Sequence, residues 1–478
     1  MATIAEIYFE LVELSGHVVA KGAWSSTLRA NCLYQSALLA KPGRRCRLLQ
    51  GTLEITPFTP LAALDLGLGT CIHVVWLSSP AADILLLSNA FAAIKADGRV
   101  VTWGGAQIGG DSAAVAPLLT EGVVQVCGNT HAFAAIKADG RVVTWGSADY
   151  GGNSSAVAAL LAEGVVHICG NQYSFAAIKA DGRVVTWGDG VVQVCGNTAA
   201  FAAIEADGRV VTWGGAQIGG DSAAVAPLLT EGVVQVCGRT CSDLGSADYG
   251  GNSSAVASLL TEGVVQVCGN TAAFAAIKAD GRVVTWGGAW AGGNSSAVAS
   301  LLTEGVVQVC GNTAAFAAIK ADGRVVTWGD AGHGGDSSAV APLLAEGSVQ
   351  IQGTKMAFAA IKANGSVVTW GRADYAGDSS AVAPLLTEGV FQVCGNQLAF
   401  AAIKANGSVV TWGRADYGGD SSAVAPLLTE GVVQVCATNL AFAAIKANGS
   451  VVTWGFAECG GNSSSVAPLL TEGVVQIY

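Results

Sequence analysis

The stretch VVQVCGNTHAFAAIKADGRVVTWG, residues 123–146, recurs along most of this 478-residue chain and decides its fold. Its first run, 123–127, is rich in valine and predicts a β-strand. A short turn leads to a second apolar run, 133–137. Asp139-Gly140 then predicts a tight hairpin turn into a third run, 141–145, because both residues tolerate the positive φ that such turns require. The last three copies carry Asn-Gly at this turn, which preserves its chemistry.

The tryptophan that ends the third run marks each copy. Most neighbouring tryptophans are 42 residues apart, and two intervals of 26 (Trp187 to Trp213) and 73 (Trp213 to Trp286) indicate deletions. These tryptophans and the glycine of each hairpin turn are the site residues that the repeat predicts, and their role is structural. They are Trp103, Trp145, Trp187, Trp213, Trp286, Trp328, Trp370, Trp412 and Trp454, with Gly98, Gly140, Gly182, Gly208, Gly281, Gly323, Gly365, Gly407 and Gly449.

The second and third runs are apolar on both faces, so each small sheet must be covered on both sides. The unit has no long helical stretch, and neighbouring sheets are left as the cover. Blades stacked around an axis supply that cover and protect their edges. The expected fold class is therefore all-β: a propeller-like array of three- to four-stranded antiparallel blades over 81–478, with a small α+β domain over 1–80. A linear β-solenoid is the rival architecture.

Two units are truncated. With units phased from residue 81, there are eight full units and two short ones, 165–190 and 233–263, and the chain stops one strand into a further unit. The second short unit lacks the hairpin that supplies phenylalanine and tryptophan elsewhere. We therefore expect 188–263 to be a distorted blade or a break between two sub-arrays. It should be the first region to open and to be cleaved.

Composition narrows the function classes. The net charge is −11, which gives no electrostatic support for a nucleic-acid partner. No segment reaches the apolar length of a membrane span, and glutamates interrupt the first apolar run, which argues against a signal peptide. These features predict a cytoplasmic or nuclear protein with neither nucleic-acid nor membrane partners.

Catalytic and metal-binding patterns are missing from the sequence. There is no Cys-x-x-Cys pair, no phosphate-loop lysine and no His-Glu-x-x-His. Eight cysteines occupy one position of the repeat, at the end of a strand, where a buried thiol is expected: Cys127, Cys169, Cys195, Cys237, Cys268, Cys310, Cys394 and Cys436. We expect no enzyme activity, no cofactor and no metal site.

The repeat resembles that of the regulator of chromosome condensation family over residues 81–478. The likeness lies in the order of a valine-rich strand, Gly128, His131, an apolar strand, Gly140, a further strand and Trp145-Gly146. The resemblance implies a β-propeller, usually of seven blades. This array departs from the family pattern, because the histidine is kept only at His131 and long inter-strand insertions are missing.

Residues 1–80 lack the repeat and resemble a diverged ubiquitin-like domain. Strands are expected at 7–12, 17–19, 47–49 and 72–77, with a helix over 27–40. A conjugated ubiquitin ends in Gly-Gly, whereas this segment ends in Ser78-Ser79-Pro80. The resemblance therefore implies docking rather than conjugation.

The leading functional hypothesis is a non-catalytic protein–protein interaction scaffold, with a candidate link to ubiquitin signalling. One alternative is a regulatory module of a HERC-type ubiquitin ligase system. Another is guanine-nucleotide exchange on a small GTPase. Strand reversal predicts that turns such as 120–122 share one charged rim with the hairpin turns, and this rim is a candidate docking ring. The partner is an unknown protein, with ubiquitin-pathway components and a small GTPase as candidates.

Overall fold

A computed structural model gives the fold. It describes residues 88–170 and 263–478 without a break. It also describes 6–13, 18–26, 30, 33, 37, 46–50, 53–55, 61–64, 70–76, 174–181, 183–188, 200–205, 210–214, 233–238, 256, 259 and 260.

The N-terminal residues form one mixed five-stranded sheet in the order β2-β1-β5-β3-β4, in which β1 and β5 are parallel. The strands are β1 (Glu6–Glu13), β2 (Val18–Ser25), β3 (Cys46–Gln50), β4 (Leu53–Ile55) and β5 (Cys71–Trp76), and the 3-10 helix η1 spans Leu61–Ala63. Alternation places Phe9 and Leu11 in a core that also holds Leu33 and Ala37. Those last two residues are helical, and most of the expected helix 27–40 lies outside the described residues.

The rest of the described chain forms nine three-stranded antiparallel sheets, each of which is one blade. We call the valine-rich run strand A, the Phe-Ala-Ala-Ile run strand B and the run that ends in Trp-Gly strand C; B lies in the middle. In the order A, B, C the blades are β8 (Val123–Gly128), β9 (Ala132–Lys137), β10 (Val142–Gly146); β11 (Val165–Gly170), β12 (Ser174–Lys179), β13 (Val184–Gly188); β16 (Val233–Gly238), β14 (Ala200–Glu205), β15 (Val210–Gly214); β17 (Val264–Gly269), β18 (Ala273–Lys278), β19 (Val283–Gly287); β20 (Val306–Gly311), β21 (Ala315–Lys320), β22 (Val325–Gly329); β23 (Ser348–Gly353), β24 (Ala357–Lys362), β25 (Val367–Gly371); β26 (Val390–Gly395), β27 (Ala399–Lys404), β28 (Val409–Gly413); β29 (Val432–Ala437), β30 (Ala441–Lys446), β31 (Val451–Gly455); and β32 (Val474–Ile477), β6 (Ala90–Lys95), β7 (Val100–Gly104).

Burial on both faces explains why the blades stack. Phe175 on strand B is fully buried, and its ring stacks on Trp187 of strand C at a centroid distance of 5.4 Å. The indole N–H of Trp187 donates to the carbonyl of Gly151, 3.0 Å away in the connector that leads into this blade. Gly151 has a φ of 85°, and a Cβ there would lie 2.8 Å from the Phe175 ring. The same indole hydrogen bond joins six other described blades to the chain before them, so these blades are both packed on and hydrogen-bonded to their neighbours.

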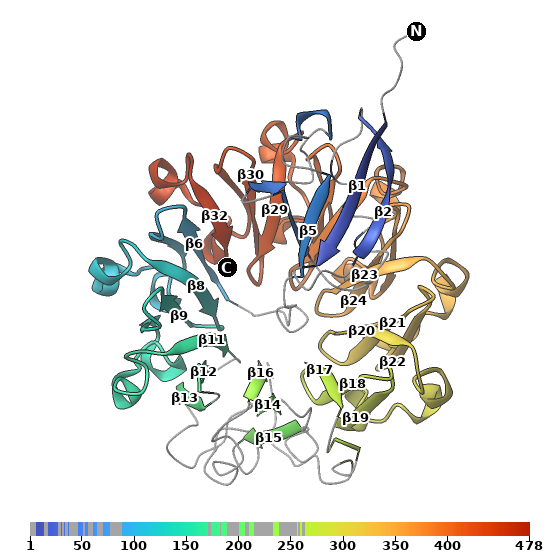
Figure 1. The fold of residues 1–478 in the computed structure, drawn as a ribbon, viewed down its shortest axis with the longest axis horizontal. Helices are drawn as coiled ribbons and strands as arrows, with labels where there is room; N and C mark the ends of the chain where they lie inside the picture. The colour runs from blue at the N-terminus through green and yellow to red at the C-terminus, as the bar shows by residue number, and fades with distance from the viewer. Residues whose placement is uncertain are drawn as a thin grey trace.

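The blades close into a ring (Figure 1). The A strands of neighbouring blades contact one another near the centre, as β20, β23 and β26 do. The last strand, β32, pairs with β6 and completes the first blade. The sequence showed this strand only as the start of a further unit, whereas in the fold it closes the array. The fold is a β-propeller. Its described residues make nine blades, not the seven that the family resemblance implied, and each blade has three strands.

The truncated unit 233–263 contributes a strand to a regular blade. Its strand β16 pairs with β14 in the register used by every other strand A, with Phe201 opposite Gly238. No break between sub-arrays occurs at these strands, because a copy of strand A from further along the chain fills the edge of the β14–β15 hairpin. The expected opening and cleavage elsewhere in 188–263 fall largely outside the described residues.

The connectors between blades carry two short 3-10 helices in place of the fourth strand that the sequence left open. The pairs are η3 (Ala106–Ile108) and η4 (Ala113–Leu118); η5 (Ala148–Tyr150) and η6 (Ser155–Val157); η10 (Ala289–Ala291) and η11 (Ser296–Leu301); η12 (Ala331–His333) and η13 (Ser338–Leu343); η14 (Ala373–Tyr375) and η15 (Ser380–Leu385); η16 (Ala415–Tyr417) and η17 (Ser422–Leu427); η18 (Ala457–Cys459) and η19 (Ser464–Leu469). A strand B lysine ties each connector down; the Lys137 ammonium, for example, donates to the Leu118 carbonyl at 3.0 Å.

Among the described residues, no helix is long and apolar enough to cross a membrane.

Candidate functional site: the variable rim

The two edges of the ring differ in how much the repeats vary. At one edge, which we call the charged rim, the turns between strands B and C read Lys-Ala-Asp-Gly-Arg or Lys-Ala-Asn-Gly-Ser in nearly every copy. At the opposite edge, the turn after strand A and the first residues of the connector differ from copy to copy. We call this edge the variable rim. Its described residues are 88–89, 105–108, 129–131, 147–150, 270–272, 288–291, 312–314, 330–333, 354–356, 372–375, 396–398, 414–417, 438–440 and 456–459.

In six of the blades, a buried asparagine or threonine joins the two loops of the variable rim. The Asn129 side-chain oxygen accepts hydrogen bonds from the backbone N–H groups of His131 and Ala132, at 2.9 and 2.7 Å. Its amide nitrogen donates to the Tyr150 carbonyl at 2.7 Å. Asn270, Asn312 and Asn396 donate in the same way, and at two positions a threonine, Thr354 or Thr438, donates through its hydroxyl. This clamp fixes the backbone that carries the variable side chains.

A belt of backbone hydrogen bonds runs from blade to blade along this rim. The Lys355 N–H donates to the Gln397 carbonyl, and the Gln397 N–H donates to the Asn439 carbonyl, both at 3.0 Å. The Asn439 N–H then donates to the Ser88 carbonyl at 2.8 Å, across the ring closure. Thr271 and Thr313 extend the belt in the other direction. Neighbouring loops are therefore held at fixed spacing, which suits a surface that binds across several blades.

Aromatic and arginine side chains gather on four of five consecutive blades of the variable rim. Trp290 is 49% exposed and Phe456 is 38% exposed. The Arg372 guanidinium lies 5.3 Å from the centre of the Tyr375 ring, and the next blade repeats this arrangement with Arg414 over Tyr417 at 5.4 Å. The Tyr417 ring lies 6.0 Å from the Phe456 ring. We call Trp290, Arg372, Tyr375, Arg414, Tyr417 and Phe456 the aromatic arc.

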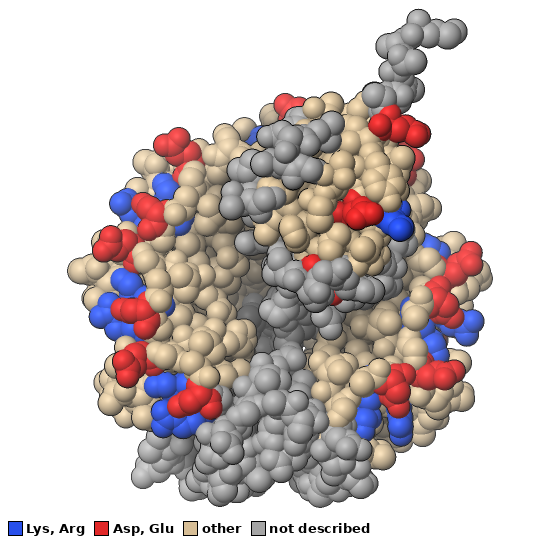
Figure 2. All heavy atoms as spheres, viewed as in Figure 1, with Lys and Arg blue, Asp and Glu red and all other residues tan. Residues whose placement is uncertain are grey.

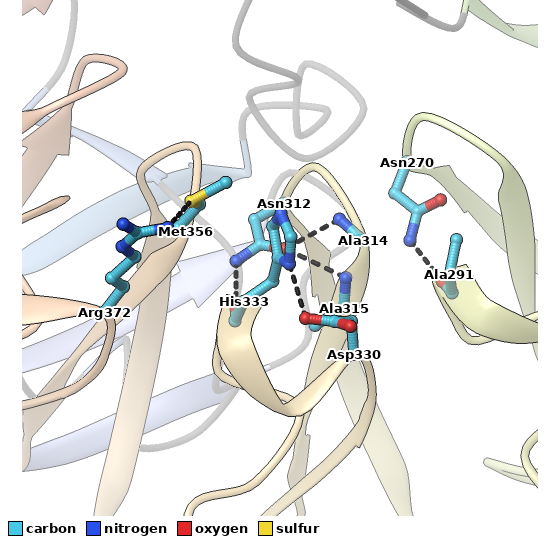
Figure 3. A network of polar contacts seen from close by, with 9 residues as sticks. All are labelled: Asn270, Ala291, Asn312, Ala314, Ala315, Asp330, His333, Met356 and Arg372. Carbon is cyan, nitrogen blue, oxygen red and sulfur yellow. Dashed lines mark hydrogen bonds and ion pairs between the residues drawn. The ribbon is translucent and has the colours of Figure 1, made fainter. Parts of the chain in front are cut away.

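The blade between Trp290 and Arg372 carries a histidine instead. The His333 ring Nδ1 lies 2.6 Å from an oxygen of Asp330, and Asn312 donates to the His333 carbonyl (Figure 3). In the blade of β23, β24 and β25, the Arg372 guanidinium lies 3.8 Å from the Met356 sulfur, which is in the turn between β23 and β24. Elsewhere on the rim, the His131 ring lies 4.0 Å from the Tyr150 ring, and burial lowers the pKa of His131. A neutral histidine in such a setting packs rather than titrates at neutral pH.

No group of three or more His, Cys, Asp or Glu residues that could hold a metal ion occurs in the described part of the chain. The cysteines at the end of strand A are free thiols in that part, and burial raises the pKa of Cys127 and of Cys268 to about 12. Thiols held in this state are poor nucleophiles and poor metal ligands.

The charged rim lies on the face seen in Figure 2, where charged side chains gather along the outer edge of the ring. Arg183 and Asp181 pair at 2.7 Å and Arg282 and Asp280 at 3.0 Å, and the counterparts Arg99–Asp97 and Arg324–Asp322 lie at 3.8 Å. The backbone N–H of Arg183 lowers the pKa of Asp181, with a smaller contribution from the arginine charge. Both partners of these pairs are largely exposed, so the pairs contribute little to stability. The near balance of charge gives this rim no preference for a highly charged partner.

The structure places the predicted site residues in the blade interiors and at the hairpin turns. Of the nine tryptophans, the eight whose side chains are described are buried. The described hairpin glycines have φ near 77°, as Gly98 and Gly365 do; Gly182 and Gly208 lie outside the described residues. Neither the asparagine clamp nor the aromatic arc was predicted from the sequence. The signal for the clamp was the asparagine that recurs after strand A, and the signal for the arc was the few positions where large side chains replace small ones within otherwise copied units.

No protein-family model and no curated protein matches this chain. Solved structures of similar fold include the CRINKLY WD40 ectodomain of the Arabidopsis thaliana receptor kinase ACR4, 16% identical, with a TM-score of 0.35, covering 70% of this chain and 97% of that one. Another is yeast RCC1 (Prp20) bound to Kap60, 13% identical, with a TM-score of 0.39, covering 75% and 89%. The Saccharomyces cerevisiae Prp20p structure, described with its binding to Gsp1p and histones, is 12% identical, with a TM-score of 0.34, covering 79% and 82%. The propeller assignment rests on this chain's own strand pairing and ring.

Proposed function

We propose that this chain is a non-catalytic scaffold that binds a protein partner through the variable rim. The aromatic arc carries the proposal. On four of five consecutive blades the repeat keeps its interior and changes its rim to Trp290, paired Arg and Tyr residues, and Phe456. Tryptophan, tyrosine and arginine are the side chains that contribute most to binding energy at protein interfaces.

The hydrogen bonds that hold the loops of the aromatic arc in place favour the binding of a partner. The asparagine clamp and the backbone belt hold each loop in place, so little loop entropy is lost when a partner binds. Each arginine over its tyrosine restricts both side chains before contact. A rigid, amphipathic arc of this kind fits a folded protein surface or an extended segment that crosses several blades.

A quantitative affinity capture with the full chain tests the proposal. The test variant is Tyr375→Ala/Tyr417→Ala/Phe456→Ala. The control, Arg141→Ala/Arg282→Ala/Arg324→Ala, removes three exposed side chains of the charged rim. We expect specific partners of the wild-type chain to be lost with the first variant and kept with the second. Capture of the same proteins by the wild-type chain and by both variants would show that the aromatic arc does not bind them.

A second candidate function is a regulatory module of the ubiquitin system, such as one acting with a HERC-type ligase. The observation in its favour is the N-terminal sheet, whose order β2-β1-β5-β3-β4 and parallel β1–β5 pair agree with the resemblance to ubiquitin-like domains. Binding of the full chain to proteasome or ligase components should be lost in Leu11→Asp, which charges the buried core of this sheet. Binding that is missing in the wild type, or unchanged in the variant, would end this proposal.

Exchange of guanine nucleotide on a small GTPase stays a proposal that rests on the repeat resemblance alone. Nucleotide release measured across a panel of GTPases, with and without the full chain, is its test. Release rates unchanged by the chain would dispose of it.

A further inference from the structure

A row of valines lies on the inner part of the face that carries the charged rim. These valines are exposed in one half of the ring. The second residue of strand A sits at a β-bulge, as Val124 does between Val123 and Gln125. The exposed fractions of Val475, Val124, Val166 and Val265 are 53, 57, 58 and 52%. We call these four residues the valine row. They come from β32, β8, β11 and β17, on either side of the blade that β16 completes.

The same position is covered in the other half of the ring. Val307, Val349, Phe391 and Val433, on β20, β23, β26 and β29, are buried or partly buried. Val265 and Val307 make the sharpest comparison, because both lie in Val-Val-Gln-Val-Cys-Gly strands that pair in the same register with Ala-Phe-Ala-Ala-Ile-Lys. Val307 packs against the buried cluster that neighbouring blades share, and Phe391 and Val433 pack against the corresponding cluster further along the ring.

The N-terminal sheet lies over this half of the ring (Figure 1). In Figure 1, β1, β2 and β5 lie in front of the blades that run from β23 to β30, and the blades of β8, β11 and β17 are free of them. The N-terminal sheet therefore makes one half of this face higher than the other. We call the half that it covers the raised half, and the half that exposes the valine row the low half. Exposed apolar side chains that recur on one face are candidates for an interaction site.

We propose that the low half binds the N-terminal sheet of a second copy of this chain, in a closed two-fold dimer. This face is self-complementary, because a two-fold axis sets the raised half of each copy against the low half of the other. The N-terminal sheet has its own exposed apolar residues for this contact, Tyr8 on β1 and Val18 on β2, at 45 and 42% exposure. One isologous interface then buries both apolar patches of both chains.

Charge does not oppose this arrangement. The outer edge of the same face carries Arg–Asp pairs within single turns, such as Arg99 with Asp97 and Arg324 with Asp322. Like charges are thus interspersed with opposite ones where two rings would approach. Inside this edge, the described surface seen in Figure 2 is chiefly uncharged.

Sedimentation velocity of the full chain over a wide concentration range tests the proposal. We expect a reversible monomer–dimer equilibrium in the wild type. Val124→Asp/Val166→Asp and, separately, Tyr8→Asp should each shift the chain to monomer, because each places charge in the contact. The control is Leu118→Asp/Leu160→Asp, which changes exposed leucines that lie in the connectors leading into the same two blades, outside the valine row; it should dimerise like the wild type.

Mixing the two monomeric variants tests the geometry itself. In the proposed dimer of Tyr8→Asp with Val124→Asp/Val166→Asp, one of the two contacts is wild-type on both sides, so the mixture should recover part of the dimer. Unchanged thermal unfolding of each variant would show that it is folded. A wild-type chain that stays monomeric, assembles without limit, or dissociates equally in the leucine control would overturn the proposal, and so would a mixture that recovers no dimer.

Discussion

Ala376 is where one residue departs from the geometry of the repeat. Other described connectors place glycine at this position, and Ala376, with a φ of 70°, is the only non-glycine residue with positive φ in the described chain. It is fully buried, and its carbonyl accepts the Trp412 indole N–H at 3.1 Å. A left-handed conformation costs an alanine about 1–2 kcal/mol. The repeat thus stores strain at one blade junction.

Ala376→Gly should therefore stabilise the fold. Relief of strain outweighs the extra unfolded-state entropy of glycine, roughly 0.5–1 kcal/mol, and leaves a gain on the order of 0.5–1 kcal/mol. The midpoint of denaturant unfolding measures it. The reverse change one blade on, Gly418→Ala, should be clearly destabilising, because its Cβ would lie 2.6 Å from the Phe442 ring. A lower midpoint for Ala376→Gly would contradict this account.

The buried thiols give a prediction on pH. Burial raises the pKa of Cys127 and of Cys268 from 9.0 to about 12, because the thiolate is poorly solvated there. Between those values the unfolded chain has released protons that the folded chain keeps, so stability falls as pH rises. The slope is about 1.4 kcal/mol per pH unit for each thiol. The double variant Cys127→Ala/Cys268→Ala should show a shallower loss between pH 9 and 12.

Alkylation gives an independent measurement of the same groups. At mildly alkaline pH, site-resolved mass spectrometry of the folded chain should find the exposed Cys71 modified well before Cys127 and Cys268. Unfolding should make all three reactive. Rapid modification of Cys127 in the folded chain would show that its thiol is neither buried nor held protonated.

At the scale of elements, chemically identical strands are interchangeable. The hexapeptide Val-Val-Gln-Val-Cys-Gly occurs at 191–196, directly before the β14–β15 hairpin, and again at 233–238. The structure pairs β14 with the second copy. The first copy is nearer to β14 in the sequence, so a local pairing would use it. The arrangement of the ring, and not side-chain chemistry, therefore decides which copy pairs with β14.

Val236→Asp should show which copy the blade uses. Valines at this position of other blades, such as Val126 and Val267, are buried, and an unpaired buried charge costs on the order of 3–5 kcal/mol. The same change at Val194, in the identical hexapeptide, is the matched control. Thermal unfolding should be lowered strongly by Val236→Asp and much less by Val194→Asp. The opposite order would mean that the upstream copy completes the blade.

At the scale of the whole molecule, the two ends of the array hold the ring closed. Strand β32 pairs with β6, and the Trp103 indole N–H donates to the Gly460 carbonyl at 3.1 Å, the same bond that joins other neighbouring blades. Val474 and Ile477 are both buried at this junction. The first blade thus depends on residues from the opposite end of the array.

Ile477→Asp should open the ring. The charge would lie in the core shared by the first and last blades. We expect a lower unfolding temperature and a larger radius of gyration by small-angle scattering. Ile477→Val is the control, since it removes one methylene and typically costs about 0.5–1.5 kcal/mol. A closed, compact Ile477→Asp protein would mean that β32 is not needed for closure.

The sequence by itself determined the content of each blade. Valine runs, Phe-Ala-Ala-Ile runs and Asp-Gly turns specify strands A, B and C through local chemistry, and strand reversal placed the hairpin turns and the Thr-Glu-Gly turns on one rim. Backbone contacts agree, since the Ala138 N–H donates to the Gly122 carbonyl at 2.8 Å. The variable positions could also have been read as a candidate site, because they differ within otherwise copied units.

Only the tertiary structure decided how the copies are joined. Nine blades close because the small rotation between neighbouring blades adds up around a full turn, and no single unit encodes that sum. The partner of β16 and the pairing of β32 with β6 follow from the same cause: repeated strands are chemically alike, so only position in the ring selects between them. The aromatic arc and the valine row are likewise products of the ring, because the contributions of their different blades are one or more whole repeats apart in sequence.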